Sequence, residues 1–132
     1  MQPTANLREA RAYVRLKPEP GFPISVDING EGFIDVTHAI DIGEGGIRIK
    51  VSHRFNGSNI DNITSFVIHL PQPINKDFRV EGRIRHVRDD SFGVQFLALG
   101  DHSRTLLRHY IALCLRSHNF WDYVRYQLGL IR

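Results

Sequence analysis

The hydrophobic pattern of the chain changes period once, and this change most limits the fold. From residue 22 to residue 98, apolar and polar side chains alternate in six short runs, as half-buried strands do. From residue 101 onward, apolar residues recur at helical spacing. Six short strands without intervening helices predict an antiparallel barrel or sandwich, followed by a helical C-terminal segment.

The alternation places the strands at about 22–28, 31–42, 46–52, 66–70, 78–86 and 92–98. Asn29-Gly30 is a strong signal for a two-residue hairpin turn. The second strand is expected to turn one apolar face to the core, made of Ile34, Val36, His38, Ile40 and Ile42. His38 and His86 fall on such apolar faces and are expected in the core or at a barrel end.

Two C-terminal helices are predicted, at about 101–116 and 119–131. Asp101 or Ser103 would cap the first helix. The second helix is expected to bury a stripe formed by Trp121, Val124, Leu128 and Ile131. The aromatic residues Phe120, Trp121, Tyr123 and Tyr126 favour packing against the barrel, and an interface for a partner or a second copy of the chain is the alternative.

The length of 132 residues fits one domain with its own core. Residues 1–21 contain three prolines and few apolar side chains, so they are expected to form a flexible arm, with residues 22–132 forming the barrel and helices. No apolar run approaches the ~20 residues that span a bilayer, so no membrane insertion is expected. The only cysteine, Cys114, cannot form an internal disulfide, which favours the cytoplasm.

The charge balance indicates a mild preference for anionic partners. Seventeen basic and 14 acidic residues give a net charge of +3 and a pI near 9.4. Of the basic residues 14 are arginine, whose planar fork suits phosphate and guanine, although codon bias gives the same excess. Arg79, Arg83 and Arg85 form an outer stripe on the fifth strand, which is more often a solvated face than a binding surface.

Catalytic and metal chemistry have no support in the sequence. The seven histidines include no H-x-x-x-H or H-E-x-x-H arrangement, and Cys114 has no second cysteine with which to complete a metal site. There is no G-x-S-x-G nucleophile motif. We therefore expect a protein without catalytic residues, metal or cofactor.

The stretch Asp41-Ile42-Gly43-Glu44-Gly45-Gly46 between the second and third strands is the first place to expect a ligand. Glycine permits positive φ and lets another group come close to the main chain. Successive main-chain amides in such a turn can also form a nest that holds an anion.

Three segments together resemble the PilZ domain of bacteria. They are Arg11-Ala12-Tyr13-Val14-Arg15, the 41–46 turn, and Phe92-Gly93-Val94-Gln95-Phe96, and the resemblance covers roughly residues 8–116. The family motifs are R-x-x-x-R before the first strand and (D/N)-x-S-x-x-G between the second and third. Because R-x-x-x-R also occurs at 79–83 and 104–108, the order of the motifs carries the resemblance.

The resemblance implies a six-stranded antiparallel β-barrel with a C-terminal helix and cyclic di-GMP as the ligand. The implied binding residues are Arg11, Arg15, Asp41, Gly43 and Gly46, with Arg48 as an accessory contact. An arginine fork can bind a phosphate or the guanine O6/N7 edge. Asp41 could accept from the guanine N1–H and N2 amine or orient an arginine, and the amide of Gly46 could face the anion.

One residue departs from the family pattern: Gly43 stands where the family has serine. The hydroxyl that would contact the ligand is missing, and only the main-chain amide remains. On this basis the substitution Gly43→Ser is expected to strengthen binding.

The resemblance predicts a non-enzymatic receptor whose arm becomes ordered by cyclic di-GMP. The ordered arm would then signal to a protein partner in motility, adhesion or exopolysaccharide control. One alternative is a PilZ module that has lost the nucleotide and acts through protein contacts. The other is a nucleic-acid-binding barrel, which the small net charge and the few outward aromatic residues disfavour.

Overall fold

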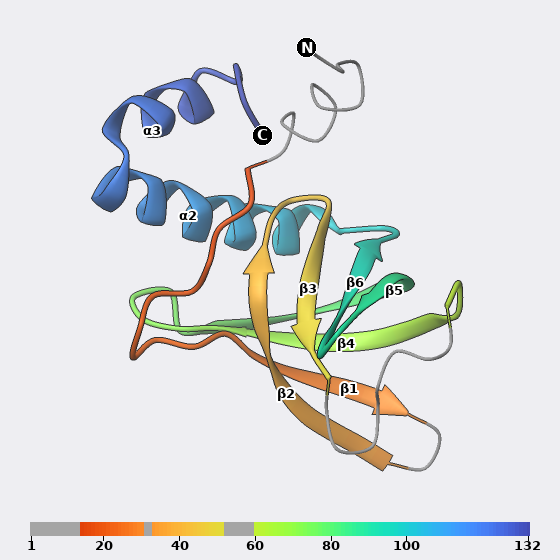
Figure 1. Cartoon of the computed structure of the whole chain (residues 1–132). Helices are drawn as coiled ribbons and strands as arrows, with labels where there is room; N and C mark the ends of the chain where they lie inside the picture. The colour runs from red at the N-terminus through yellow and green to blue at the C-terminus, as the bar shows by residue number, and fades with distance from the viewer. Residues whose placement is uncertain (1–13, 31–32, 52–59) are drawn as a thin grey trace.

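The computed structural model of the chain describes residues 14–30, 33–51 and 60–132. Six antiparallel strands close into a barrel in the order β1-β2-β3-β6-β5-β4, followed by two helices (Figure 1). The elements are β1 (Ser25–Gly30), β2 (Phe33–Ile42), β3 (Gly46–Lys50), β4 (Ile63–Leu70), β5 (Lys76–Arg88), β6 (Ser91–Phe96), α2 (Asp101–His118) and α3 (Phe120–Gln127). The predicted barrel with C-terminal helices is confirmed, and its closure excludes the sandwich.

The barrel interior is filled by the inward members of each alternating run. Fully buried examples are Val26, Ile28, Ile47, Ile49, Phe66, Ile68, Ile84 and Phe92. Helix α2 lies across one end of the barrel, beside the β2–β3 turn (Figure 1), and adds Leu107, Ile111 and Leu115 to the same core. The helix therefore closes the barrel end at which the candidate site lies.

The predicted apolar face of β2 is wrong over its first half. Ile34 and Val36 are 66% and 61% exposed, whereas Ala39 and Ile42 are buried. The register with β3 shifts between Ala39 and Asp41. A bulge adds one residue and reverses which side chains face inward, so strict alternation cannot be carried through it. His38 is exposed for the same reason.

A second bulge explains the position of His86. The register between β5 and β6 shifts between Ile84 and Val87, so that Arg85 and His86 lie opposite the single residue Gly93. His86 is therefore exposed and does not enter the core as predicted. Both bulges lie in strands at the side of the barrel that carries the candidate site.

The hairpin prediction places the first turn too early. Asn29 and Gly30 pair with Ile34 and Phe33 as part of the β1–β2 ladder. The connection therefore falls on residues 31–32, which lie outside the described residues. The preference of Asn-Gly for turns is outweighed here by continued strand pairing.

The helices differ from the prediction at their ends. Gly100, and not Asp101 or Ser103, precedes the first turn of α2, without a side-chain cap. Helix α3 ends at Gln127, and Gly129 has a φ of +78°, which is typical of the residue after a helix. Of the predicted stripe, Val124 and Ile131 are partly buried, whereas Trp121 and Leu128 are 67% and 68% exposed, so the prediction is wrong for these two residues.

Tyr126 is the buried residue of α3. Its hydroxyl bonds to Glu44, an interaction between distant segments that periodicity does not reveal. Within the described parts of the chain, no helix is both long and apolar enough to cross a membrane.

The described end of the N-terminal arm lies against the barrel and the helices. The main chains of Leu16 and Ile42 exchange two hydrogen bonds of 2.8 and 2.9 Å, and the Val14 N–H donates to the Arg132 carbonyl. Glu19 forms an ion pair with His118 at the end of α2. Figure 1 shows this segment crossing α2 on its way to β1. The described end of the arm therefore contacts both the last residue, Arg132, and the end of β2 at Ile42.

On the outer barrel wall, His69 of β4 lies between two carboxylates from the neighbouring strands. Its Nε2 is 2.9 Å from Asp27 Oδ2, and its Nδ1 is 2.8 Å from Asp77 Oδ1. Partial burial lowers the pKa of His69, but the hydrogen bonds and charges of Asp27 and Asp77 together outweigh it and raise the pKa above 6.5. The imidazolium is therefore favoured by folding.

We expect the contribution of His69 to stability to depend on pH. Because the folded pKa lies above the unfolded value, the stabilisation is complete below pH 6.5 and is lost as pH rises through the folded pKa. His69→Gln should therefore cost about 0.5–1 kcal/mol of unfolding free energy in mildly acidic buffer, as for a partly exposed pair. Urea unfolding at mildly acidic and mildly alkaline pH measures the difference.

The matched control for this prediction is His109→Gln, at an exposed histidine of α2. This control should change stability little at either pH. An equal cost of His69→Gln at both pH values would contradict the assignment of the imidazolium to this pair.

Candidate functional site

The turn between β2 and β3 is closed by its own main chain. The Gly43 N–H donates to the Gly46 carbonyl at 2.9 Å, and the Gly45 carbonyl accepts from the Phe96 N–H at 3.0 Å. Among the described glycines only Gly21 and Gly129 have positive φ. The turn glycines are therefore not needed for left-handed backbone, and the Gly43 amide is not open to an anion as a nest would require.

Close approach is what these glycines allow. A Cβ atom on Gly46 would overlap the carbonyl oxygen of Val94 on β6. A Cβ atom on Gly43 would overlap the carbonyl oxygen of Val14 and lie 3.2 Å from Arg15 Cδ. Gly43 thus forms the surface on which the arm rests, next to the Leu16–Ile42 pair.

Arg15 and Asp41 form the contact between the side chains of the arm and β2. The Arg15 Nε donates to Asp41 Oδ1 at 3.0 Å, and Nη2 donates to the same oxygen. The side chains are 43% and 23% exposed, so a ligand can reach both. The structure brings these two predicted residues together, whereas Arg11 lies outside the described residues.

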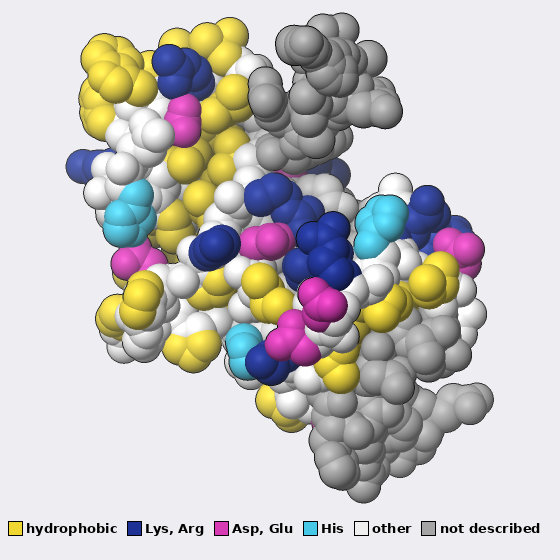
Figure 2. Space-filling model, viewed as in Figure 1, with side chains coloured by type: hydrophobic (Ala, Val, Ile, Leu, Met, Phe, Trp, Pro, Cys, Tyr) yellow, Lys and Arg dark blue, Asp and Glu magenta, His cyan; other side chains and the backbone are white. Residues whose placement is uncertain are grey.

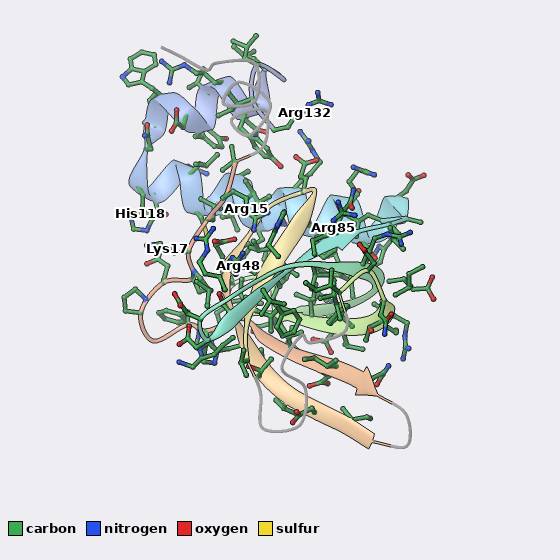
Figure 3. The ribbon with its side chains drawn as sticks, turned by 45° about the vertical axis from the view of Figure 1, so that its right-hand side comes forward. Arg15, Lys17, Arg48, Arg85, His118 and Arg132 are labelled. Carbon is green, nitrogen blue, oxygen red and sulfur yellow. The ribbon has the colours of Figure 1, made fainter. Side chains whose placement is uncertain are left out.

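An open cavity of about 340 Å³ lies beside Arg15, over β3, β6 and β5. Gly46 and Gly93 give it a floor without side chains. The other polar residues that line it are Arg48, Arg85, His86 and Gln95. Figure 3 shows Arg15, Arg48 and Arg85 gathered over these strands, with Arg15 coming from the arm. Arginines from three separate segments, the arm, β3 and β5, therefore line the cavity.

Arg48 is held in place by its neighbours. Its Nη1 donates to Ser91 Oγ at 2.6 Å, and its Nη2 lies 3.6 Å from the point where a Cβ on Gly93 would stand. The Ser91 hydroxyl in turn donates to the Arg88 carbonyl at 3.2 Å. The structure thus places the predicted accessory residue in the same cavity as Arg15, on a fixed strand.

Arg85 and His86 line the cavity, although the sequence interpretation did not include them among the expected binding residues. It took Arg79, Arg83 and Arg85 together as a stripe that is more often a solvated strand face than a set of accessory anion contacts. Arg79 bonds to Ser65 and Arg83 to the main chain of Asp61, and neither lines the cavity. Arg85 lines the cavity, and its Nη1 also lies 3.5 Å from Asp61 Oδ1. The bulge opposite Gly93 aims Arg85 and His86 toward the cavity. The isolated glycine inside a strand was the available signal, since such glycines mark bulges and close approaches.

The site is electrostatically suited to an anion. Figure 2 shows basic side chains clustered on this face of the molecule, with acidic side chains next to several of them. The described residues that line the cavity include no carboxylate, and Asp41 is paired with Arg15 at its edge. A larger cavity of about 490 Å³ lies between the arm, the β4–β5 turn and α2, but it is lined largely by apolar side chains. The smaller cavity is therefore the candidate for a phosphate ligand.

In the part of the chain that the structure describes, no group of three His, Cys, Asp or Glu side chains is arranged to hold a metal ion. Asp27 and Asp77 face opposite nitrogens of His69, so they do not converge on a shared point.

Solved structures of bacterial proteins share this fold. The inhibitor of motility MotI/DgrA from Bacillus subtilis has a TM-score of 0.67 and 19% identity over 82% of this chain and 52% of its own. YcgR from Escherichia coli in complex with c-di-GMP has a TM-score of 0.62 and 16% identity over 87% and 50%. The chain thus spans about half the length of these two proteins.

The isolated PilZ domain of YcgR from Escherichia coli, solved with c-di-GMP, has a TM-score of 0.62 and 12% identity. It is covered over 97% of its length by 85% of this chain. A comparison with curated proteins finds no match. The sequence model of the PilZ domain matches residues 9–113. This match includes the arm, the 41–46 turn and all six strands, and the chain therefore belongs to the PilZ domain family.

Proposed function

We propose that this chain is a non-enzymatic receptor for cyclic di-GMP and binds it in the cavity beside the arm. The observation that carries the proposal is the convergence of Arg15, Arg48 and Arg85 on one open cavity with a glycine floor. Three arginines from the arm, β3 and β5 match a ligand with two phosphates and two guanines. Their planar forks can bind either group.

In the proposed complex a guanine lies over Gly46 and against the Arg48 guanidinium, whose Nη2 is 3.6 Å from the Cβ position of Gly93. Arg48 and Arg85 flank the cavity floor and bind a phosphate or stack on the base. Asp41 accepts from the guanine N1–H and N2 amine or continues to orient Arg15. Arg11, four residues before Arg15 in the sequence, also contacts the ligand in this proposal, although it lies outside the described residues.

The fold supports this assignment, because PilZ domains of the same architecture have been solved with c-di-GMP in YcgR. The signalling part of the proposal goes further. We propose that ligand binding changes the arm and that the arm then contacts a protein partner, as in control of motility, adhesion or exopolysaccharide. The site of action in this proposal is the cytoplasm. A ligand drives such a change only through its different affinities for the two arm states.

Isothermal titration of the whole chain with cyclic di-GMP tests the proposal. We expect saturable binding at micromolar concentrations, and no comparable heat with GMP, which offers one base and one phosphate. No heat at high micromolar cyclic di-GMP, from protein shown to be folded by circular dichroism, would instead support a PilZ module that acts through protein contacts alone.

The same protein preparation also tests the alternative of a nucleic-acid-binding barrel. Stronger binding to a random single-stranded oligonucleotide than to cyclic di-GMP, weakening steeply with salt, would support that alternative. The cavity argues against it, since His86 is the only aromatic ring among the described residues that line it. Proteins of that kind stack successive bases on aromatic side chains.

A further inference from the structure

Glu44 is a buried carboxylate in the β2–β3 turn that the proposed ligand contacts do not use. It is only 6% exposed. Its Oε2 accepts from Arg108 Nη1 at 2.7 Å and from the Tyr126 hydroxyl at 2.6 Å, and Arg104 Nη1 lies 3.8 Å from Oε1. A buried charge with this many donors is held strongly in place, because moving it away would leave it unpaired.

The partners of Glu44 come from both C-terminal helices. Arg104 and Arg108 lie one turn apart on the same face of α2, and Tyr126 is the fully buried residue of α3. The Arg108 guanidinium also lies over the Tyr126 ring, 4.7 Å from its centroid. Burial, followed by the bond to Glu44, raises the pKa of Tyr126, so the hydroxyl stays protonated and donates. One carboxylate therefore ties the turn to α2 and α3 together.

The main-chain bonds on either side of Glu44 connect it to the ligand site. The preceding residue, Gly43, supports the arm and donates to the Gly46 carbonyl. The following residue, Gly45, lines the cavity and accepts from Phe96. A displacement of Glu44 therefore disturbs both the arm contact and the cavity floor.

We propose that Glu44 is a positioning residue that couples the ligand site to helix α3 through Tyr126 and Arg108. It holds the turn in the shape that binds the ligand, and it holds α3 on the turn. The coupling is reciprocal: a ligand that prefers this turn conformation also favours the present placement of α3. The identity of the ligand rests on the proposed function, whereas the tie between the turn and the helix does not.

The substitution Tyr126→Phe tests the proposal, because it removes one hydroxyl and keeps the buried ring. The matched control is Tyr123→Phe on the same helix, where the hydroxyl accepts from Gln127 and does not contact the turn. We expect Tyr126→Phe to weaken cyclic di-GMP binding about fivefold to tenfold, within the range of allosteric couplings. Tyr123→Phe should stay within about twofold of the unchanged protein.

A spectroscopic signal reports the helix directly. Trp121 is the only tryptophan of the chain, lies on α3 and is 67% exposed. Titration with cyclic di-GMP should change its fluorescence in the unchanged protein and in Tyr123→Phe. In Tyr126→Phe, saturated with ligand, the change should be lost or strongly reduced. A merely structural role of Tyr126 would leave the fluorescence change at saturation intact.

Hydrogen exchange by NMR tests the connection between the β2–β3 turn and helix α3 without any ligand. The amides to follow are those of Gly43 and Phe96, which bond to Gly46 and Gly45. Both should exchange at least about fivefold faster in Tyr126→Phe than in Tyr123→Phe if the turn opens locally. Unchanged exchange, in protein that is folded, overturns the proposal whether or not cyclic di-GMP binds. If these amides exchange faster in Tyr126→Phe but cyclic di-GMP does not bind the unchanged protein, only the identity of the proposed ligand is overturned.

Discussion

The substitution Gly43→Ser is expected to weaken cyclic di-GMP binding by more than about tenfold, or at least 1.4 kcal/mol. The serine Cβ would overlap the Val14 carbonyl oxygen and press on Arg15 Cδ. The arm would have to move off the turn and would take Arg15 away from Asp41. The motif alone predicts the opposite, because the serine would restore the hydroxyl that the family uses.

The close contact outweighs the restored hydroxyl for a structural reason. The obstructing atom belongs to the main chain of Val14, and that main chain is fixed by the Leu16–Ile42 hydrogen bonds two residues further on. A flexible side chain would yield at little cost, but this backbone cannot move without breaking its pairing. Glycine at position 43 is therefore matched to an arm that lies unusually close to the turn.

Isothermal titration of Gly43→Ser beside Gly100→Ser provides the measurement. Gly100 precedes α2 and has open space where a Cβ would stand, so the same chemical change there should leave affinity and folding unaffected. Thermal unfolding of both variants separates loss of binding from loss of structure. Tighter binding by Gly43→Ser would show that the arm is absent from this position in the complex.

The barrel could be predicted from the sequence because its signal is repeated in every strand. Inward residues such as Ile47, Ile49 and Phe92 follow strict alternation and are buried as expected. The failures occur where one residue interrupts the ladder. At Ile40 and around Arg85 a bulge shifts the register, and alternation carries no information about where an extra residue is inserted.

The site was predictable only in the parts that lie within contiguous motifs. Arg15 and Asp41 are brought together as the order of the motifs implied, and Arg48 follows two residues after Gly46 along the same strand. Arg85 enters the cavity through strand pairing. Glu44 finds its partners 64 and 82 positions further along the chain. Such contacts depend on tertiary packing, which a local pattern does not encode.

The substitutions Arg15→Ala and Asp41→Ala are each expected to weaken cyclic di-GMP binding at least about tenfold, since one good arginine fork is worth ~1–3 kcal/mol. Arg15 would lose its contact with a phosphate or guanine. Asp41→Ala would remove the carboxylate that accepts from the base or that orients Arg15 at 3.0 Å. The proteins should remain folded, because a half-exposed ion pair contributes at most about 1 kcal/mol to stability.

The double variant distinguishes the two roles of Asp41. If its function is to orient Arg15, losing both side chains costs little more than losing Arg15 alone. The combined loss should then fall short of the product of the single losses by about threefold or more. If Asp41 binds the guanine independently, the two losses multiply.

Arg79→Ala serves as the charge-matched control for Arg15→Ala. Arg79 lies on β5 like Arg85, but it bonds to Ser65 on β4 and does not line the cavity. Its removal lowers the net charge by the same unit and should change affinity less than about twofold, because exposed charges at a distance are screened by salt. Equal losses in Arg79→Ala and Arg15→Ala would mean that affinity follows overall charge. The arm would then have no specific role in holding the ligand, and the basic face as a whole would attract it.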